Sequence, residues 1–155
     1  MLKNKFLSFV IFTIITFSAS FIGGIVTYTF KEPWYSNLIK PSFNPPDWVF
    51  GPVWTILYLF MSIAIWIVWQ KNQKNLNLVL IYIIHLFFNT TWSIVFFAFQ
   101  SILLALINLV ALITLIIFLM IKYKPISKLS FYIMFPYLLW CFFALILNTS
   151  LLFLN

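Results

Sequence analysis

The chain has 155 residues, of which 65% are hydrophobic and only 7% are charged, whereas about a quarter of a typical soluble domain is charged. So little polar surface excludes a soluble globular fold and indicates an integral membrane protein. The formal net charge is +7, and the one cysteine, Cys141, excludes a disulfide within the chain.

A helix needs about 20 apolar residues to cross a bilayer. Uncharged stretches of at least this length fill most of the chain. They are Phe6–Phe30, Trp48–Gln70, Asn75–Ile121 and Leu129–Asn155. The third is about twice the length of one crossing, and we expect it to fold back near Ala98–Ser101, where Gln100 and Ser101 interrupt the apolar run. We therefore predict an all-α integral membrane protein, a single domain of residues 1–155 with five transmembrane helices near 6–29, 49–69, 77–97, 101–121 and 129–152.

The lysines predict how this bundle is oriented in the membrane. One side of a five-helix serpentine receives most of them, namely Lys3, Lys5, Lys71, Lys74, Lys122, Lys124 and Lys128. The other side receives Lys31 and Lys40 together with Glu32 and Asp47. The positive-inside rule then predicts a cytoplasmic N-terminus and an external C-terminus, in a bacterial cell membrane if the lysine- and isoleucine-rich composition reflects a prokaryotic source. The charge follows topology, so no nucleic-acid partner is expected.

A proline- and tryptophan-rich loop separates the first two predicted helices. Residues 31–48 contain Pro33, Pro41, Pro45 and Pro46. Because proline fixes φ and removes a backbone donor, we expect turns and extended pieces here, with one helical turn around Ser36–Ile39. Gly51-Pro52 is expected to start the second helix, and Pro136 is expected to kink the fifth.

Three predicted helices carry aromatic and polar side chains along one face. These faces hold Phe50, Trp54, Leu57, Tyr58 and Met61 on the second helix, His85, Asn89, Trp92 and Phe96 on the third, and Tyr137, Trp140, Ala144, Leu147 and Asn148 on the fifth. We predict that they point inward, because unpaired polar groups are costly in hydrocarbon. Periodicity leaves two interpretations open: plain helix packing with interhelical amide hydrogen bonds, or a pocket for a large planar apolar ligand.

Other chemistries find less support in the sequence. His85 could serve as a single haem ligand, but a satisfied interior histidine is the commoner outcome. No acidic residue lies deep in a span, which disfavours an ion-coupled pump. The sequence has no glycine-rich phosphate loop and no metal-spaced Cys/His cluster, so no metal site is expected.

Spaced motifs then occur in order along the chain. They are Trp34-Tyr35, Lys40-Pro41-Ser42-Phe43-x-Pro45-Pro46-x-Trp48, Phe50-Gly51-Pro52-Val53-Trp54-x-x-Leu57-Tyr58, Asn89-x-x-Trp92-Ser93-x-x-Phe96-Phe97 and Pro136-Tyr137-x-x-Trp140-x-x-Phe143-Ala144-x-x-Leu147-Asn148. With these motifs the chain resembles the TspO/MBR family of tryptophan-rich sensory and translocator proteins, from about Gly23 to Asn155. It departs from the family at His85, where a glutamine is usual, and it lacks the sterol pattern of the animal proteins after Ala144.

The resemblance implies a five-helix bundle, often a homodimer, with a pocket open toward the first loop. It implies a ligand such as protoporphyrin IX or haem, or another hydrophobic small molecule, in a protein surrounded by membrane lipid and without a required cofactor. Carried over to this sequence, the ligand-binding residues are expected to be Tyr35, Pro45, Trp54, Asn89, Trp92, Trp140, Ala144 and Leu147.

We expect a membrane protein that senses, transports or sequesters tetrapyrroles. Anionic propionates of such a ligand are expected near Lys31 or Lys40. One alternative is an enzyme that degrades porphyrin in light and oxygen, for which Trp54 and Trp140 are the candidate catalytic residues. Another is a lipid- or sterol-binding scaffold, in which the aromatic faces are simply core.

Overall fold

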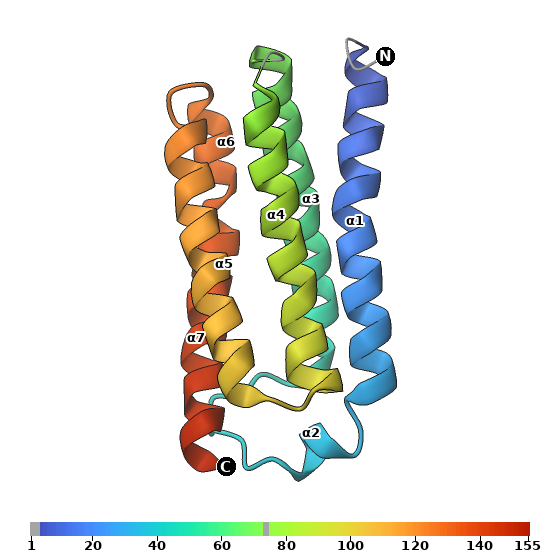
Figure 1. The fold of residues 1–155 in the computed structure, drawn as a ribbon, viewed down its shortest axis with the longest axis vertical. Helices are drawn as coiled ribbons and strands as arrows, with labels where there is room; N and C mark the ends of the chain where they lie inside the picture. Colours follow the sequence, from blue (N-terminus) through green and yellow to red (C-terminus); the bar gives the residue numbers. More distant parts are fainter. Residues whose placement is uncertain (1–3, 73–74) are drawn as a thin grey trace.

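The computed structural model of the chain describes residues 4–72 and 75–155 (Figure 1). Lys3 and Lys74, which entered the topology prediction, lie outside the described residues. The described elements are α1 (Lys5–Phe30), α2 (Trp34–Asn37), α3 (Asp47–Lys71), α4 (Leu76–Ser93), the π-helix η1 (Ile94–Ala98), α5 (Ile102–Tyr123), α6 (Lys128–Ile133) and α7 (Phe135–Leu154).

Five helices in the described ranges are long and apolar enough to cross a membrane: α1, α3, α4 continued by η1, α5, and α6 continued by α7. Their ends lie within one or two residues of the predicted ranges. The prediction of an all-α protein with five transmembrane helices is therefore confirmed, and the chain is a multi-pass integral membrane protein.

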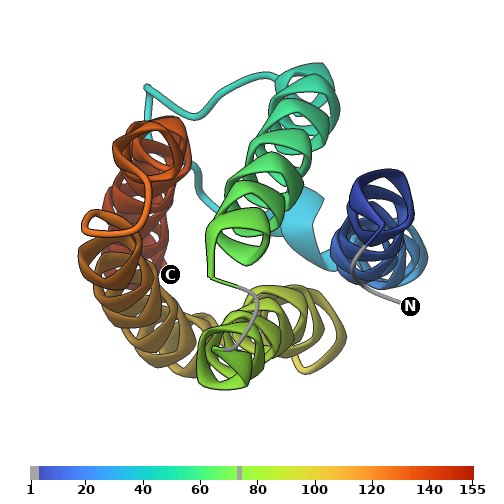
Figure 2. The same cartoon turned by 90° about the horizontal axis from the view of Figure 1, so that it is seen from above.

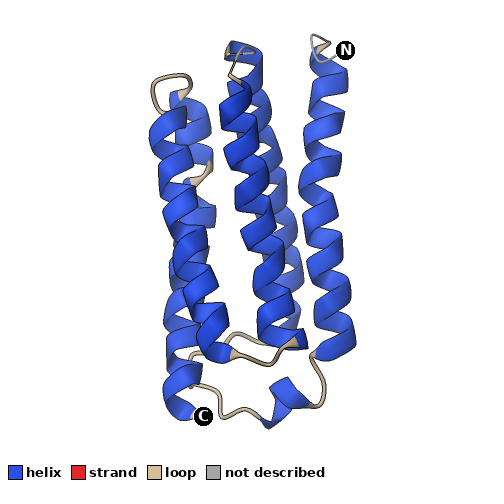
Figure 3. Ribbon diagram, viewed as in Figure 1, coloured by secondary structure: helices blue, strands red, loops and turns tan. Residues whose placement is uncertain are grey.

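The five long helices run side by side and form a closed ring when viewed along the bundle (Figures 1 and 2). The ring order is α1, α3, α6–α7, α5 and α4, and each neighbouring pair is in contact. Loops lie at the two ends of the bundle, and the start of α1 and the end of α7 lie at opposite ends (Figures 1 and 3). We call the end that holds Lys5, Lys71, Lys122, Lys124 and Lys128 the lysine end, and the end that holds α2 the loop end.

Short polar side chains begin several of the helices. Asn4 Oδ1 accepts a hydrogen bond from the Phe6 amide at 2.9 Å at the start of α1, and Ser101 Oγ accepts one from Leu104 at 3.4 Å at the start of α5. Asn75 and Ser127 cap α4 and α6 in the same way. These caps satisfy amides that the first turn leaves unpaired, and they set where each crossing begins.

Two local predictions about the first loop are wrong. The helical turn is α2, Trp34–Asn37, which starts directly after Pro33, so it comes two residues earlier than expected. Gly51-Pro52 does not start the second membrane helix, because α3 already begins at Asp47, after Pro46. A proline before the helix and a carboxylate in its first turn both favour that earlier start, and Pro52 leaves the Trp48 carbonyl without its helical hydrogen bond.

The two predicted interruptions of the later helices are present. The chain reverses between α4–η1 and α5, with Gln100 in the left-handed region at φ 52°. The fifth crossing breaks at Met134, directly before Phe135-Pro136, into α6 and α7. The π-helix η1 was not predicted, and its wider turn is closed by the Phe99 amide donating to the Ile94 carbonyl at 3.0 Å.

The lysine-end half of the bundle is tightly packed. Met61, Ala64 and Ile65 on α3, Tyr82 on α4, and Ile116, Leu119 and Tyr123 on α5 are all completely buried there. The Tyr82 hydroxyl is paired with the Thr16 hydroxyl of α1 at 2.6 Å. The loop-end half is different, because its helices enclose a cavity.

Candidate functional site

A cavity of about 680 Å³ occupies the loop-end half of the bundle. Its lining comes from α1, α3, α4, η1, α5 and α7, and from the loop segments around α2. The lining includes most of the predicted ligand-binding residues, namely Tyr35, Trp54, Asn89, Trp92, Trp140, Ala144 and Leu147. Pro45 is not among the lining residues. It lies in the loop that joins α2 to α3, where its carbonyl accepts a hydrogen bond from Asn44 Nδ2 at 3.0 Å.

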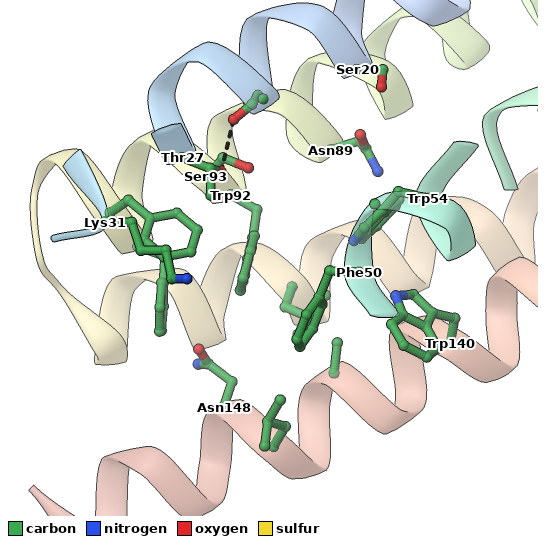
Figure 4. Close-up of a pocket in the computed structure, with 18 of the residues that line it drawn as sticks. Ser20, Thr27, Lys31, Phe50, Trp54, Asn89, Trp92, Ser93, Trp140 and Asn148 are labelled. Atoms are coloured by element: carbon green, nitrogen blue, oxygen red, sulfur yellow. Dashed lines mark hydrogen bonds between the residues drawn. The ribbon is translucent and has the colours of Figure 1, made fainter. Parts of the chain in front are cut away.

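Three indole rings from three helices face this cavity (Figure 4). Trp54 comes from α3, Trp92 from α4 and Trp140 from α7, and each is only half-buried. Phe96 stacks on Trp92 with ring centroids 5.0 Å apart and an interplanar angle of 12°, and Phe50 meets Trp140 edge to face at 6.0 Å. These contacts hold the indoles rigidly and leave part of each ring facing the cavity.

A hydrogen-bonded cluster lies at the inner end of the cavity. The Tyr58 hydroxyl donates to Asn89 Oδ1, and Asn89 Nδ2 donates to the Tyr137 hydroxyl at 2.9 Å. Tyr137 Oη also lies 2.8 Å from Nε2 of the completely buried His85. His85 does not line the cavity. It is therefore an interior histidine held by a tyrosine, and Tyr58 and Asn89 are the members of the cluster that line the cavity.

Two polar atoms of the cavity lining have no hydrogen-bond partner among the described residues: Trp92 Nε1 and Asn148 Oδ1. The orientation of the Asn148 amide follows from its other contact, because Nδ2 donates to the Ile102 carbonyl at 3.0 Å and a carbonyl can only accept. Asn148 Oδ1 is therefore an acceptor without a partner, and like Trp92 Nε1 it is buried within the wall of the cavity.

Charged side chains line the loop end of the cavity. Lys31 Nζ forms an ion pair with Asp47 and lies 3.7 Å from a Glu32 oxygen, and all three residues belong to the lining. Burial lowers the pKa of Lys31, but the hydrogen bond and charge of Asp47 and the charge of Glu32 outweigh it, so the pKa lies above its usual value. Lys31 is therefore a fully charged and paired ammonium at neutral pH.

The loop that covers this end is tied down by hydrogen bonds. The Ile39 amide donates to Asn155 Oδ1 at 2.9 Å, and Asn155 Nδ2 donates back to the Ile39 carbonyl at 3.1 Å. The Tyr35 hydroxyl donates to Asn44 Oδ1 at 3.3 Å. Burial raises the pKa of Tyr35, so its hydroxyl stays protonated well above neutral pH. The loop is fixed both to the end of α7 and to α2.

The wall that α1 contributes was missed by the sequence prediction. Ser20, Gly23, Gly24 and Thr27 line the cavity from one face of this helix. A Cβ on Gly23 would lie 3.3 Å from Ser93 Oγ, whereas a Cβ on Gly24 would meet nothing within 4 Å. The small residues recur at helical spacing, which signals a face, but the same signal also fits helix packing.

Metal ligands do not gather in this region. Within the described residues, no group of three or more His, Cys, Asp or Glu side chains is placed to hold a metal ion. The lining is instead aromatic and aliphatic, with a few amide, hydroxyl and charged groups at its two ends. Such a composition suits a hydrophobic organic ligand.

Five membrane crossings around an aromatic cavity define a multi-pass membrane protein with an internal cavity of ligand size. The TspO/MBR family model matches residues 10–154, and the chain belongs to that family. It is 40% identical over 142 residues to Tryptophan-rich protein TspO of Chlorobaculum tepidum, covering 89% of each chain.

Two other relatives extend the comparison. The chain is 35% identical over 124 residues to the Tryptophan-rich sensory protein of Cereibacter sphaeroides, covering 80% of this chain and 78% of that one. It is 30% identical over 141 residues to the Translocator protein of Homo sapiens, covering 88% of this chain and 83% of that one. The recognition of the family from its motifs is therefore confirmed, whereas the individual ligand-binding roles and the homodimer stay predictions.

Proposed function

We propose that this protein binds tetrapyrroles, such as protoporphyrin IX or haem, or similar flat hydrophobic molecules, in the loop-end cavity. The observation that carries the proposal is the placement of Trp54, Trp92 and Trp140, which come from three different helices and face one cavity of about 680 Å³. A flat macrocycle offers two large apolar faces to such rings. Binding then serves sensing, transport or sequestration of the ligand.

The physical basis of the proposal is ring contact together with hydrogen bonding. An aromatic pair contributes about 0.5–1.5 kcal/mol beyond the burial of its area. The lining also holds amide and hydroxyl side chains, among them Asn89 and Ser93, that can exchange hydrogen bonds with a ligand. Trp92 and Trp140 already pack against Phe96 and Phe50, so ordering these two rings adds little cost to binding.

A titration of the detergent-purified protein with protoporphyrin IX in the dark tests the proposal. We expect a saturable change in porphyrin absorbance, and we expect Trp54→Phe and Trp140→Phe to weaken it. Trp66→Phe is the matched control, because the Trp66 indole donates to the Lys5 carbonyl at the lysine end, far from the cavity. A titration that never saturates would refute the proposal. Equal weakening of binding by Trp66→Phe would show that the ligand does not bind in the loop-end cavity.

The same indoles favour a second candidate, light-dependent degradation of a bound porphyrin. Trp54 and Trp140 lie in the cavity that would hold the excited ligand, and there the chemistry would belong to the porphyrin and oxygen. Illumination in air should then bleach the porphyrin faster than in a protein-free control, and Trp54→Phe or Trp140→Phe should slow the bleaching. Bleaching at the control rate would leave binding as the function.

We also propose that the N-terminus lies in the cytoplasm and the C-terminus outside, in a bacterial cell membrane. The described lysines of the lysine end support this orientation through the positive-inside rule. Reporter fusions at each terminus, read in intact cells, would test it. Activity of a cytoplasmic reporter at the C-terminus would reverse the orientation.

A further inference from the structure

His85 is the only histidine of the chain. It is completely buried and does not line the cavity, yet it is tied to residues that do. Its Nε2 lies 2.8 Å from the hydroxyl oxygen of Tyr137, whereas Nδ1 has no hydrogen-bond partner among the described residues. The contact with Tyr137 therefore decides which ring nitrogen carries the proton, because the other side of the ring offers no competing partner.

The hydrogen bonds of the cluster around His85 run in one direction. The Tyr58 hydroxyl donates to Asn89 Oδ1, and Asn89 Nδ2 donates to the Tyr137 hydroxyl at 2.9 Å. The proton of the Tyr137 hydroxyl then finds its acceptor within the cluster at His85 Nε2. A charged imidazole would be costly inside the membrane, so the ring is neutral, with Nε2 unprotonated and the single proton on Nδ1.

This direction orients the amide of Asn89. An amide fills almost the same volume when its oxygen and nitrogen are exchanged, so shape alone does not orient it. In the exchanged orientation Oδ1 would take the Tyr137 proton, and His85 would have to donate from Nε2 instead. Each tautomer of His85 therefore goes with one orientation of Asn89, and Asn89 lines the cavity.

Tyr137 also supports one of the indoles of the cavity. The Trp54 ring packs against Tyr58 and Tyr137, with ring centroids 5.6 Å and 6.2 Å apart. The two tyrosines come from α3 and α7, and His85 comes from α4. The cluster thus joins the same three helices that supply the three indoles, and a shift of the Tyr137 ring would move part of the cavity wall.

We propose that His85 is a positioning residue for the cavity: by accepting the Tyr137 proton at Nε2, it fixes the orientation of the Asn89 amide and holds the Tyr137 ring beside Trp54. This inference rests on the proposed function, because Asn89 and Trp54 line the cavity that receives the ligand. Loss of the acceptor at His85 should weaken porphyrin binding by about threefold to tenfold, the size of one hydrogen bond.

The single histidine makes the tautomer directly measurable. Nitrogen-15 NMR of the detergent-purified protein, labelled at histidine and made without a histidine tag, should show a protonated Nδ1 and an unprotonated Nε2. Tyr137→Phe should move the Nε2 signal, whereas Tyr82→Phe should leave it in place. Tyr82 is the matched control, because its ring centroid lies 5.6 Å from that of His85 but its hydroxyl is paired with Thr16. A protonated Nε2, or equal shifts in the two variants, would overturn the proposal.

Binding then separates positioning from general stability. Protoporphyrin IX is titrated in the dark into the parent protein, His85→Gln, His85→Leu and Ile65→Ala. Glutamine offers an acceptor oxygen, so His85→Gln should keep the affinity of the parent, whereas His85→Leu should lose it. Ile65→Ala removes a completely buried side chain of the packed lysine-end half, so it controls for lost stability and should bind like the parent.

The outcomes distinguish this inference from the proposed function. If the parent saturates and His85→Leu binds just as tightly, His85 does not position the site and the proposed function stands. Equal weakening by His85→Leu and Ile65→Ala would show a loss of stability rather than of positioning, and would also overturn the inference. If protoporphyrin IX never saturates the parent, the proposed function itself fails, whatever tautomer the NMR spectrum shows.

Discussion

The two halves of the bundle contain the same kinds of residue, but the lysine-end half is tightly packed and the loop-end half encloses a cavity. In the lysine-end half, Ile65, Tyr82 and Ile116 are completely buried. In the loop-end half, Trp54 and Trp92 are only half-buried, and they border a cavity of about 680 Å³.

Residue size and shape explain the difference. Aliphatic side chains together with tyrosines such as Tyr82 and Tyr123 fill the closed half and interlock at the density of a protein interior. In the open half, indoles and the small residues Gly24 and Ala144 line the same cavity, and the missing side-chain volume leaves space. Hydrophobicity places both halves in the membrane, and the combination of side-chain sizes makes one of them hollow.

The largest expected effect comes from a large-to-small substitution in the tightly packed lysine-end half. Ile65→Ala removes a completely buried side chain and should lower the free energy of unfolding by about 2–5 kcal/mol, because the packed surroundings cannot collapse fully. Denaturant unfolding in detergent would measure it. The porphyrin affinity of the folded protein should not change. A loss of no more than about 0.5 kcal/mol, the size of an ordinary surface substitution, would mean that the closed half is loosely packed.

The loop contacts should matter less to stability and more to the opening of the cavity. Asn155→Ala removes both hydrogen bonds to Ile39 and should cost about 1 kcal/mol, because each exposed bond contributes little. Amide hydrogen exchange should become faster at Ile39 while the closed half keeps its protection. Unchanged exchange at Ile39 would show that other contacts hold the loop.

Two neighbouring glycines on α1 allow open and packed positions to be compared within one helix. Gly24→Ala places a methyl group in open space and should stabilise the protein by about 0.5–1 kcal/mol, because alanine favours the helix. Gly23→Ala meets Ser93 Oγ at 3.3 Å and should gain less. Denaturant unfolding of both variants gives the difference. An equal gain would mean that α1 and α4 can separate without cost.

The smallest effect concerns pH at the loop end. Burial raises the pKa of Tyr35 above its usual value, so folding favours the protonated hydroxyl. The stabilisation is complete below the unfolded pKa, near 10 for tyrosine, and is lost as pH rises through the folded value. Tyr35→Phe should therefore lose stability with pH less steeply than the parent in alkaline solution. Parallel stability curves would contradict this.

Much of the fold was predictable because each crossing needs a long uncharged run and each reversal needs a break. The inward faces of α3, α4 and α7 were predictable too, since polar groups such as Asn89 and Asn148 avoid lipid. The α1 wall was not, because Gly23, Gly24 and Thr27 give the same pattern in helix packing and in a cavity wall. The loop was harder still: the Asn155–Ile39 contact joins residues far apart in the chain, and no local pattern encodes it.

The π-helix at Ile94–Ala98 has a consequence for changes in chain length. The hydrogen bond there spans five residues instead of the four of an α-helix. Within this segment Phe96 and Phe97 both contact Tyr35, with ring centroids 6.2 Å and 5.8 Å away. Deleting one residue would let the segment wind as ordinary α-helix, and the crossing would keep almost the same length. The side chains of Phe96 and Phe97 would then point in new directions, however, and their contact with Tyr35 would be lost. This short segment therefore tolerates substitution of its side chains better than it tolerates any change in their number.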